Sequence, residues 1–401
     1  MKLFSPITRN GSTSPASPVL FAQGFRIFFS LAGIWATLAM TLWLGTLNGV
    51  AWMGRLLPDS LYHGHEMVFG FTAAAAAGFM LTATPVWSKT PPLSGRPLQA
   101  LFLAWLLGRV GTLFPWHLHP WFAALADGIF LCGFLIFITP TLWFTGNPVH
   151  RIFPILLGLL AMGDLLFHGE ALQLTTRTAH TGLLLGQNAI IFFLVMTGGH
   201  ILPMFTRDAL RTNGEEITFP VSRWLEGISA TTLTLLVAAD LFFPDSPEAG
   251  WVFLVAGLVQ ALRLSRWHGH KTLQHPLLWV LHLGYLWLVA GLALRGVARL
   301  TGLLDETSAL HALSVGAMGL FTQGIMARIA LTHTGRPLRV SAFVVAAFGL
   351  ITGAAVLRVF AAPWHAGALW LSAGLWIIAF MLFCIVFLPV LSTPRPDGKA
   401  G

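Results

Sequence analysis

The sequence predicts an all-α, polytopic membrane helical bundle, and three observations lead to this class. Hydrophobic residues make up 56% of the 401 positions and charged residues only 9%, against about 25% in soluble globular proteins. The apolar residues fall into about twelve continuous runs, and a helix that crosses a bilayer needs roughly 20 such residues. The runs are long and do not alternate with period two, so helices are expected and a β-barrel is not.

Short loops are expected between the transmembrane helices. We place the spans at 21–47, 61–87, 97–114, 121–144, 153–167, 180–205, 221–243, 251–267, 276–299, 307–331, 340–360 and 366–390. Residues 1–20, rich in Ser, Thr and Pro, are expected to form a flexible lead-in. Residues 21–391 are then one transmembrane helical domain, and residues 392–401 a cytoplasmic tail.

The distribution of basic residues orients the chain. If both termini are cytoplasmic, the cytoplasmic segments contain fifteen of the 23 Lys and Arg residues, whereas the outer loops clearly contain only Arg55, Arg177 and Arg299. The positive-inside rule therefore predicts an even number of helices with both termini in the cytoplasm. Topology accounts for the net charge of +8 in this way, and no nucleic-acid partner is expected.

Polar residues gather near the ends of several spans. In chain order they are His63, His65 and Glu66 at the start of span 61–87, His168 after span 153–167, His200 near the end of span 180–205, His311 at the start of span 307–331 and His333 just after it. Histidines and carboxylates are costly inside a membrane, so such a group indicates a metal or haem site, whereas an isolated histidine such as His282 is better explained by an interhelical hydrogen bond.

The predicted topology separates these residues by depth. His63, His65, His168 and His311 fall near the outer face, and His200 and His333 fall toward the inner ends of their helices. Twenty helical residues rise about 30 Å, so one metal ion cannot be bound by both groups.

The spacing of His63 and His65 leaves two arrangements open. In a regular helix, residues two apart are rotated by about 200°, so the two imidazoles would face opposite sides while His63, Glu66 and Met67 share one face. They would then serve two centres, or one centre and a hydrogen-bonding partner of it. If Gly64 breaks the start of the helix, both could converge on one ion.

Some kinds of site are not indicated by any motif. The sequence contains no CxxCH motif, so a haem would be held non-covalently. It also contains no GxGxxG, Walker or GxSxG motif, which gives no support to nucleotide-binding or hydrolase functions.

Longer strings point to a family. They are HGHEMVFGF from His63, GFMLT from Gly78, Gly108-Arg109, GGHILPMFT from Gly198, and the block from His311 to Leu338, which contains His333-Thr334-Gly335-Arg336. These strings resemble the NnrS family, haem- and copper-associated membrane proteins linked to nitric oxide metabolism. The resemblance covers about residues 25–338.

The resemblance implies a twelve-helix protein of the bacterial cytoplasmic (inner) membrane that carries non-covalent b-type haem, with copper or a second iron as a further metal. Its place would be in nitrosative stress resistance or beside denitrification. The positions that match the polar motifs of the family are His63, His65, Glu66, His311, Arg328, His333 and Arg336.

Roles for these residues follow as expectations. His65 and His311 are expected to bind the cofactor, and Arg328 and Arg336 to pair with haem propionates or with an inner-face network. The candidate metal ligands are His63, His65, His168, His200, His311 and His333. Glu66 is expected to deliver protons as a catalytic residue without being a ligand itself.

Three functions remain open at this point. The first is an oxidoreductase of the nitric oxide reductase type, which binds and consumes nitric oxide with electrons from an unknown donor. The second is a non-catalytic haem or copper protein, a nitric oxide sensor or a metal handler. The third is a membrane transporter whose histidines form a substrate or proton path.

Overall fold

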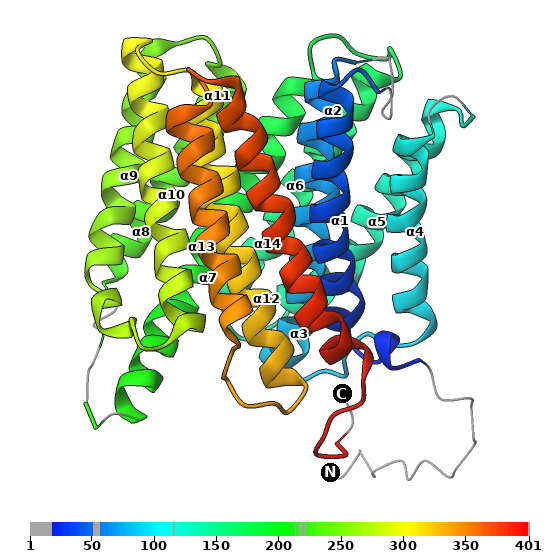
Figure 1. Cartoon of the computed structure of the whole chain (residues 1–401), viewed down its shortest axis with the longest axis vertical. Coiled ribbons are helices and arrows are strands. Elements are labelled where there is room, and N and C mark those ends of the chain that lie inside the picture. The colour runs from blue at the N-terminus through cyan, green and yellow to red at the C-terminus, as the bar shows by residue number, and fades with distance from the viewer. Residues whose placement is uncertain are drawn as a thin grey trace.

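The computed structural model describes residues 18–50, 57–114, 117–212, 214–215, 219 and 222–399, and every regular element in that part of the chain is a helix (Figure 1). This confirms the predicted all-α class. Most of the expected lead-in, residues 1–17, lies outside the described residues, as does Val221 at the start of the seventh expected span.

Twelve helical rods follow one another along the described residues, matching the twelve expected spans. Nine contain a single α-helix: α1 (Gly24–Leu47), α4 (Arg96–Leu113), α5 (Pro120–Trp143), α6 (Ile152–Ala171), α7 (Ala179–Thr212), α8 (Arg223–Phe242), α9 (Gly250–Ser265), α10 (Pro276–Thr301) and α14 (Ala366–Ser392). Short 3₁₀ turns precede four of them: η1 (Val19–Phe21) before α1, η3 (Pro148–Arg151) before α6, η4 (Pro247–Ala249) before α9 and η5 (Gly269–Thr272) before α10.

Three further rods change from α-helix to π-helix within their length. They are α2 (Asp59–His65) continuing through η2 (Glu66–Thr72) into α3 (Ala73–Ser88), α11 (Glu306–His311) continuing through η6 (Ala312–Gly319) into α12 (Leu320–His333), and α13 (Ala342–Val356) continuing into η7 (Leu357–Ala361). A π-helical segment inserts an extra residue into a turn, and such segments occur frequently at functional sites.

Eleven of the rods in the described residues are long and apolar enough to cross a membrane. The exception is α4, which has 18 residues but begins at Arg96 and also carries Arg109. It nevertheless stands beside α5 within the bundle (Figure 1). The expected span at this place is therefore a helix, but the composition of the helix by itself does not mark it as a membrane crossing.

The first and last rods meet at the same end of the bundle. The guanidinium of Arg26, two residues into α1, donates to the carbonyl of Leu391 at 2.7 Å and to that of Thr393 at 2.9 Å, at the end of α14 (Figure 1). Such an arrangement requires an even number of crossings.

The two rods that carry the first histidine motifs are the most enclosed. Of the apolar windows of Asp59–Ser88 and Glu306–His333, 89% and 83% are buried inside the protein, against 67% or less for the other spans in the described residues. The motifs His63-Gly64-His65-Glu66 and Leu310-His311-Ala312 therefore lie in the centre of the bundle, near one end, and away from the lipid-facing surface.

Candidate functional site

A cavity of about 340 Å³ lies between the two central rods, at the end where α2 and α11 begin. Its walls are mainly apolar and aromatic, with Trp43, Phe71 and Trp376 among them. Four basic side chains also face it: His63, His180, His311 and Arg358. Ligand-binding cavities are typically apolar spaces of about 300–1,000 Å³ with a few convergent polar groups, and this cavity has that character.

All three π-helical segments of the described chain contribute to this cavity. Residues of η2 and η6 line its walls, and Arg358, the second residue of η7, faces it. In two of the rods the π-helical segment begins close behind the histidine motif, at Glu66 and at Ala312. Three departures from α-helical geometry thus converge on one space, where they position the histidines and Arg358.

His63 presents a buried ring nitrogen that has no partner. Its imidazole stacks on Trp43, with ring centroids 4.6 Å apart and an interplanar angle of 18°. Its Nδ1 atom makes no hydrogen bond with the described residues. A buried polar atom without a partner is costly, so the nitrogen is suited to a ligand that supplies the missing bond.

His311 has one ring nitrogen occupied and the other available. Its Nδ1 lies 2.6 Å from the carbonyl oxygen of Thr307, one turn earlier in α11. A carbonyl only accepts hydrogen bonds, so Nδ1 carries the proton and Nε2 keeps its lone pair. Metal-binding histidines commonly donate their second nitrogen to a backbone carbonyl in this way.

Arg358 supplies a positive charge beside the two histidines. Within the described residues its side chain makes no hydrogen bond or ion pair, although Asp305 lies near enough to interact electrostatically. A guanidinium in this position could pair with a carboxylate group of a bound molecule.

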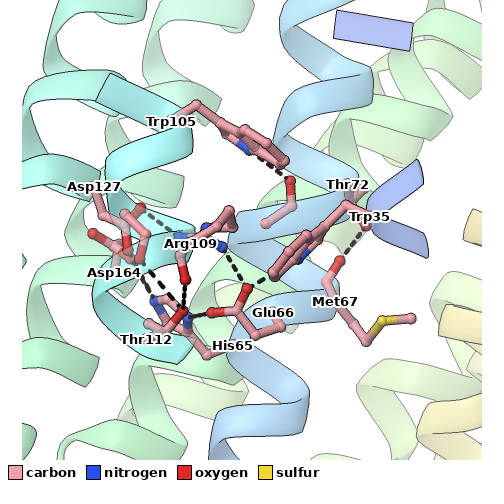
Figure 2. Close-up of polar contacts among 12 residues, drawn as sticks. Trp35, His65, Glu66, Met67, Thr72, Trp105, Arg109, Thr112, Asp127 and Asp164 are labelled. Atoms are coloured by element: carbon pink, nitrogen blue, oxygen red, sulfur yellow. Dashed lines mark hydrogen bonds and ion pairs between the residues drawn. The ribbon is translucent and has the colours of Figure 1, made fainter. Parts of the chain in front are cut away.

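A second polar group surrounds His65, on the side of the α2–η2 rod that faces away from the cavity (Figure 2). We call it the His–Asp cluster, and it comprises His65 from α2, Asp127 from α5, and Asp164 and His168 from α6. All four side chains are buried, and their four ligand atoms lie within 4.8 Å of one another. Asp164 and His168 are one helical turn apart and therefore share a face of α6.

Glu66 belongs with this cluster and does not face the cavity. Its Oε1 lies 3.0 Å from His65 Nδ1, and its Oε2 accepts hydrogen bonds at 2.9 Å from Trp35 and at 2.9 Å from Arg109 (Figure 2). Helical rotation alone places Glu66 nearer the face of His63, but Arg109 and Trp35 hold its carboxylate on the side of His65. Its expected role in proton delivery stays a prediction.

Comparison with known protein families shows to which family the chain belongs. A family model described as NnrS protein matches residues 19–395, nearly the whole length. This protein belongs to the NnrS family. The match extends beyond the region of resemblance, into α13 and α14. No curated protein matches the sequence. Membership of the NnrS family and the long apolar helices support a multi-pass membrane protein related to nitric oxide.

The structure divides the family motif residues among three places. His63 and His311 face the cavity, and His65 and Glu66 belong to the His–Asp cluster with His168. Because α2 is regular through Gly64, His63 and His65 point to opposite sides and do not converge on one ion. His65 and His311 therefore do not share a site in this structure.

The remaining motif residues lie at the other end of the bundle. His200 is exposed, and His333 packs against Phe25 with ring centroids 5.6 Å apart. The guanidinium of Arg328 covers the ring of Phe205 at 3.8 Å, and Arg336 donates to the hydroxyl of Thr393 at 3.0 Å. Among the arginines of the described chain, the cavity is lined by Arg358, and Arg328 and Arg336 do not line it.

Sequence reasoning missed Asp127, Asp164 and Arg358. Each lies within an expected span, at 121–144, 153–167 and 340–360. A charged residue inside an apolar run was the available signal, because intramembrane charges are rare and usually face the interior of a bundle. What the sequence could not supply was their partners, which come from other helices.

Proposed function

We propose that this protein is a haem protein of the bacterial cytoplasmic membrane that binds nitric oxide and consumes it by reduction. The haem would be non-covalent and b-type, held in the cavity by His63 and His311. One observation carries the proposal: imidazoles from the two most buried rods face a single cavity, and each has a free nitrogen.

The residues around the cavity fit such a group. The unpartnered Nδ1 of His63 and the available Nε2 of His311 are both suitable iron ligands. The aromatic walls suit a flat apolar macrocycle, and Arg358 suits a propionate carboxylate. In this proposal Arg358 takes the role that the sequence suggested for Arg328 and Arg336, which would then serve the network at the inner end.

A haem bound here would supply the capacity to bind nitric oxide at its iron, with one of the two imidazoles as the iron ligand and the other beside the bound gas. The protein itself would admit nitric oxide to the cavity and hold the two imidazoles in position. Nitric oxide is small, neutral and soluble in membranes, so the apolar walls admit it without a polar channel. Trp43 holds the His63 ring by stacking, and Thr307 fixes the ring of His311 through its carbonyl. Electrons would come from a separate donor, and Glu66, whose carboxylate lies outside the cavity, is proposed to deliver protons as a relay that takes up a proton and passes it on.

The proposed orientation follows from charge. The end of the bundle at which α1 begins and α14 ends also holds the loops with Lys89, Arg151, Lys271 and Arg339. By the positive-inside rule this end faces the cytoplasm, so the cavity lies toward the outer face.

A non-catalytic copper protein is the second candidate, and a specific observation favours it. The thioether side chains of Met40, Met67 and Met318 line the same cavity as His63 and His311. Thioether and imidazole ligands suit Cu(I), so the cavity could hold copper in a sensing or metal-handling role.

Spectroscopy and metal analysis of the purified full-length protein test both candidates. We expect a Soret band, and nitric oxide consumption when an artificial electron donor is added. His63→Ala and His311→Ala should lose the band while the protein still inserts and folds. The matched control is His200→Ala, because this exposed histidine lies at the other end of the bundle and should leave the band unchanged.

Each alternative has its own outcome. Copper without a Soret band, lost in the same two variants, would support the copper protein and overturn the haem proposal. A Soret band without nitric oxide consumption would leave a haem sensor. Normal spectra and metal content in both His63→Ala and His311→Ala would remove the cavity from consideration as the cofactor site.

A further inference from the structure

We propose that the His–Asp cluster is a closed binding site for one divalent transition cation, with Zn²⁺ as the best match. The ligands would be the Nε2 atoms of His65 and His168 and one carboxylate oxygen each from Asp127 and Asp164. This site is separate from the cavity, since it lies on the other side of the α2–η2 rod, and the inference goes beyond the proposed function.

Four of the six distances between the candidate ligand atoms are close to those of a coordination shell. Nε2 of His65 lies 3.0 Å from Asp164 Oδ1 and 3.8 Å from Asp127 Oδ2, and the corresponding distances from Nε2 of His168 are 3.6 and 3.3 Å. Ligands at about 2.0–2.1 Å from a tetrahedral Zn²⁺ are separated by about 3.3 Å. The observed nitrogen–oxygen distances span this value, so an ion would require only small adjustments of the side chains.

The charge of the cluster also calls for a divalent cation. Three buried carboxylates, those of Glu66, Asp127 and Asp164, lie at it, and the guanidinium of Arg109 contacts two of them, Glu66 and Asp127. With neutral imidazoles the group carries a net charge of −2, from three negative groups and one positive group. An uncompensated charge of this size is strongly unfavourable in the interior of a membrane protein; without an ion, protons on the imidazoles must balance it, and a divalent ion would displace those protons.

The surrounding hydrogen bonds orient the ligands for this purpose. Glu66 accepts from His65 Nδ1, and His65 Nε2 lies at hydrogen-bond distance, 3.0 Å, from Asp164 Oδ1, so an ion bound between these two atoms would replace the proton on Nε2. Glu66 is in turn held by Arg109, and Arg109 also donates to Asp127 through the oxygen that does not face the histidines. A carboxylate that accepts from the second nitrogen of a histidine is a common support of zinc ligands.

The kind of site follows from its enclosure. Four protein ligands complete a tetrahedral shell, and the four residues do not line the cavity. Structural zinc sites are closed in this way, whereas catalytic sites keep an open position. The ion would therefore join α2, α5 and α6 and fix the rod whose other side presents His63 to the cavity.

Metal analysis of the full-length protein in detergent tests the inference. After loading with ZnCl₂ and removal of excess ion, we expect about one Zn²⁺ per chain in the wild type. Asp164→Asn and His168→Ala should lose it. The control is His63→Ala, on the same helix but facing the cavity, which should keep the ion. Wild-type protein without bound Zn²⁺, or equal Zn²⁺ content in all variants, would overturn the proposal.

Two further measurements remain decisive if the ligand variants fail to fold. X-ray absorption of the zinc-loaded wild type should show four nitrogen or oxygen ligands near 2.0–2.1 Å, and a shell with sulfur or with six ligands would contradict the site. Glu66→Gln keeps all four ligands and should weaken Zn²⁺ affinity by roughly 10–100-fold. A wild-type protein that binds Zn²⁺ but shows no Soret band would count against the proposed function and would leave the zinc site supported.

Discussion

Two buried ionic groups in the described part of the chain, the His–Asp cluster and a second group, differ in their charge balance. The second group, which we call the Asp240 network, comprises Asp240 of α8, Arg295 and Arg299 of α10, and Glu306 of α11. Both oxygens of Asp240 accept from Arg295 at 2.9 Å, and one also accepts from Arg299 at 2.7 Å. Two guanidinium groups face two carboxylates, so the network is neutral without any ligand.

The Asp240 network is electrically neutral by itself, whereas the carboxylates at the His–Asp cluster outnumber the arginines beside them. The Asp240 network contains no histidine, and its carboxylates are paired with arginines that hold three helices together. One of these helices is α11, which carries His311 to the cavity. The His–Asp cluster together with its neighbours Glu66 and Arg109 has one arginine for three carboxylates, so the balancing positive charge must come from protons or from a bound ion. Charge balance therefore distinguishes a structural network from a candidate ligand site.

The largest change in the free energy of unfolding is expected from a substitution in the Asp240 network. Asp240→Asn leaves Arg295 and Arg299 buried with only the half-exposed Glu306 as a carboxylate partner. Removing one partner of a buried ion pair costs about 3–5 kcal/mol, and we expect a loss of this size in the free energy of unfolding. Denaturant unfolding in detergent measures it. A loss below about 1 kcal/mol would show that water replaces the lost carboxylate.

The response to zinc should distinguish the two groups. At a free Zn²⁺ concentration of about 100 times the dissociation constant, binding stabilises the folded protein by about 2.7 kcal/mol, and chelation removes this gain. We expect the gain in the wild type and in Asp240→Asn, but not in Asp164→Asn. Thermal unfolding with and without a chelator measures it. A zinc response that survives in Asp164→Asn would place the ion elsewhere.

Glu66 and Glu306 allow a matched test of proton delivery. Glu66→Gln should preserve the haem spectrum and slow nitric oxide consumption by about 100-fold, as expected for loss of a carboxylate that delivers protons. Glu306→Gln, in the balanced network and away from Glu66, should leave consumption near the wild-type rate. Stopped-flow kinetics with zinc-saturated protein measures both. Equal rates for Glu66→Gln and the wild type would leave Glu66 as a support for His65 only.

The smallest change in stability is expected at the ion pair of the C-terminal tail. Arg395 donates to Asp397 in the C-terminal tail, and this hydrogen bond holds the pKa of the Asp397 carboxyl below its usual range. A lowered pKa in the folded protein means that the stabilisation is present at neutral pH and is lost as the pH falls below about 4. The Asp397 carboxylate is solvated, so Asp397→Asn should leave the unfolding midpoint at pH 7 unchanged within error. A clear shift would show that the tail is more firmly docked than this exposed pair suggests.

Much of the architecture was predictable because the membrane constrains it. The apolar runs gave the twelve rods within a few residues at most ends, since a helix must satisfy its own backbone hydrogen bonds in lipid. The 3.6-residue repeat also predicted that His63 and His65 face opposite sides in a regular helix, and α2 is regular there. The π-helical segments were not predictable, because no local propensity signals the extra residue in a turn.

What the sequence by itself determined is therefore the class of fold, the family and the depth of the histidines, all of which depend on local composition, periodicity and motifs. The tertiary structure decided which residues share a site. His63 meets His311 and Arg358, and His65 meets Asp127 and Asp164, across distances of tens to hundreds of residues. These partners are chosen by the packing of helices against one another, which a one-dimensional pattern does not encode.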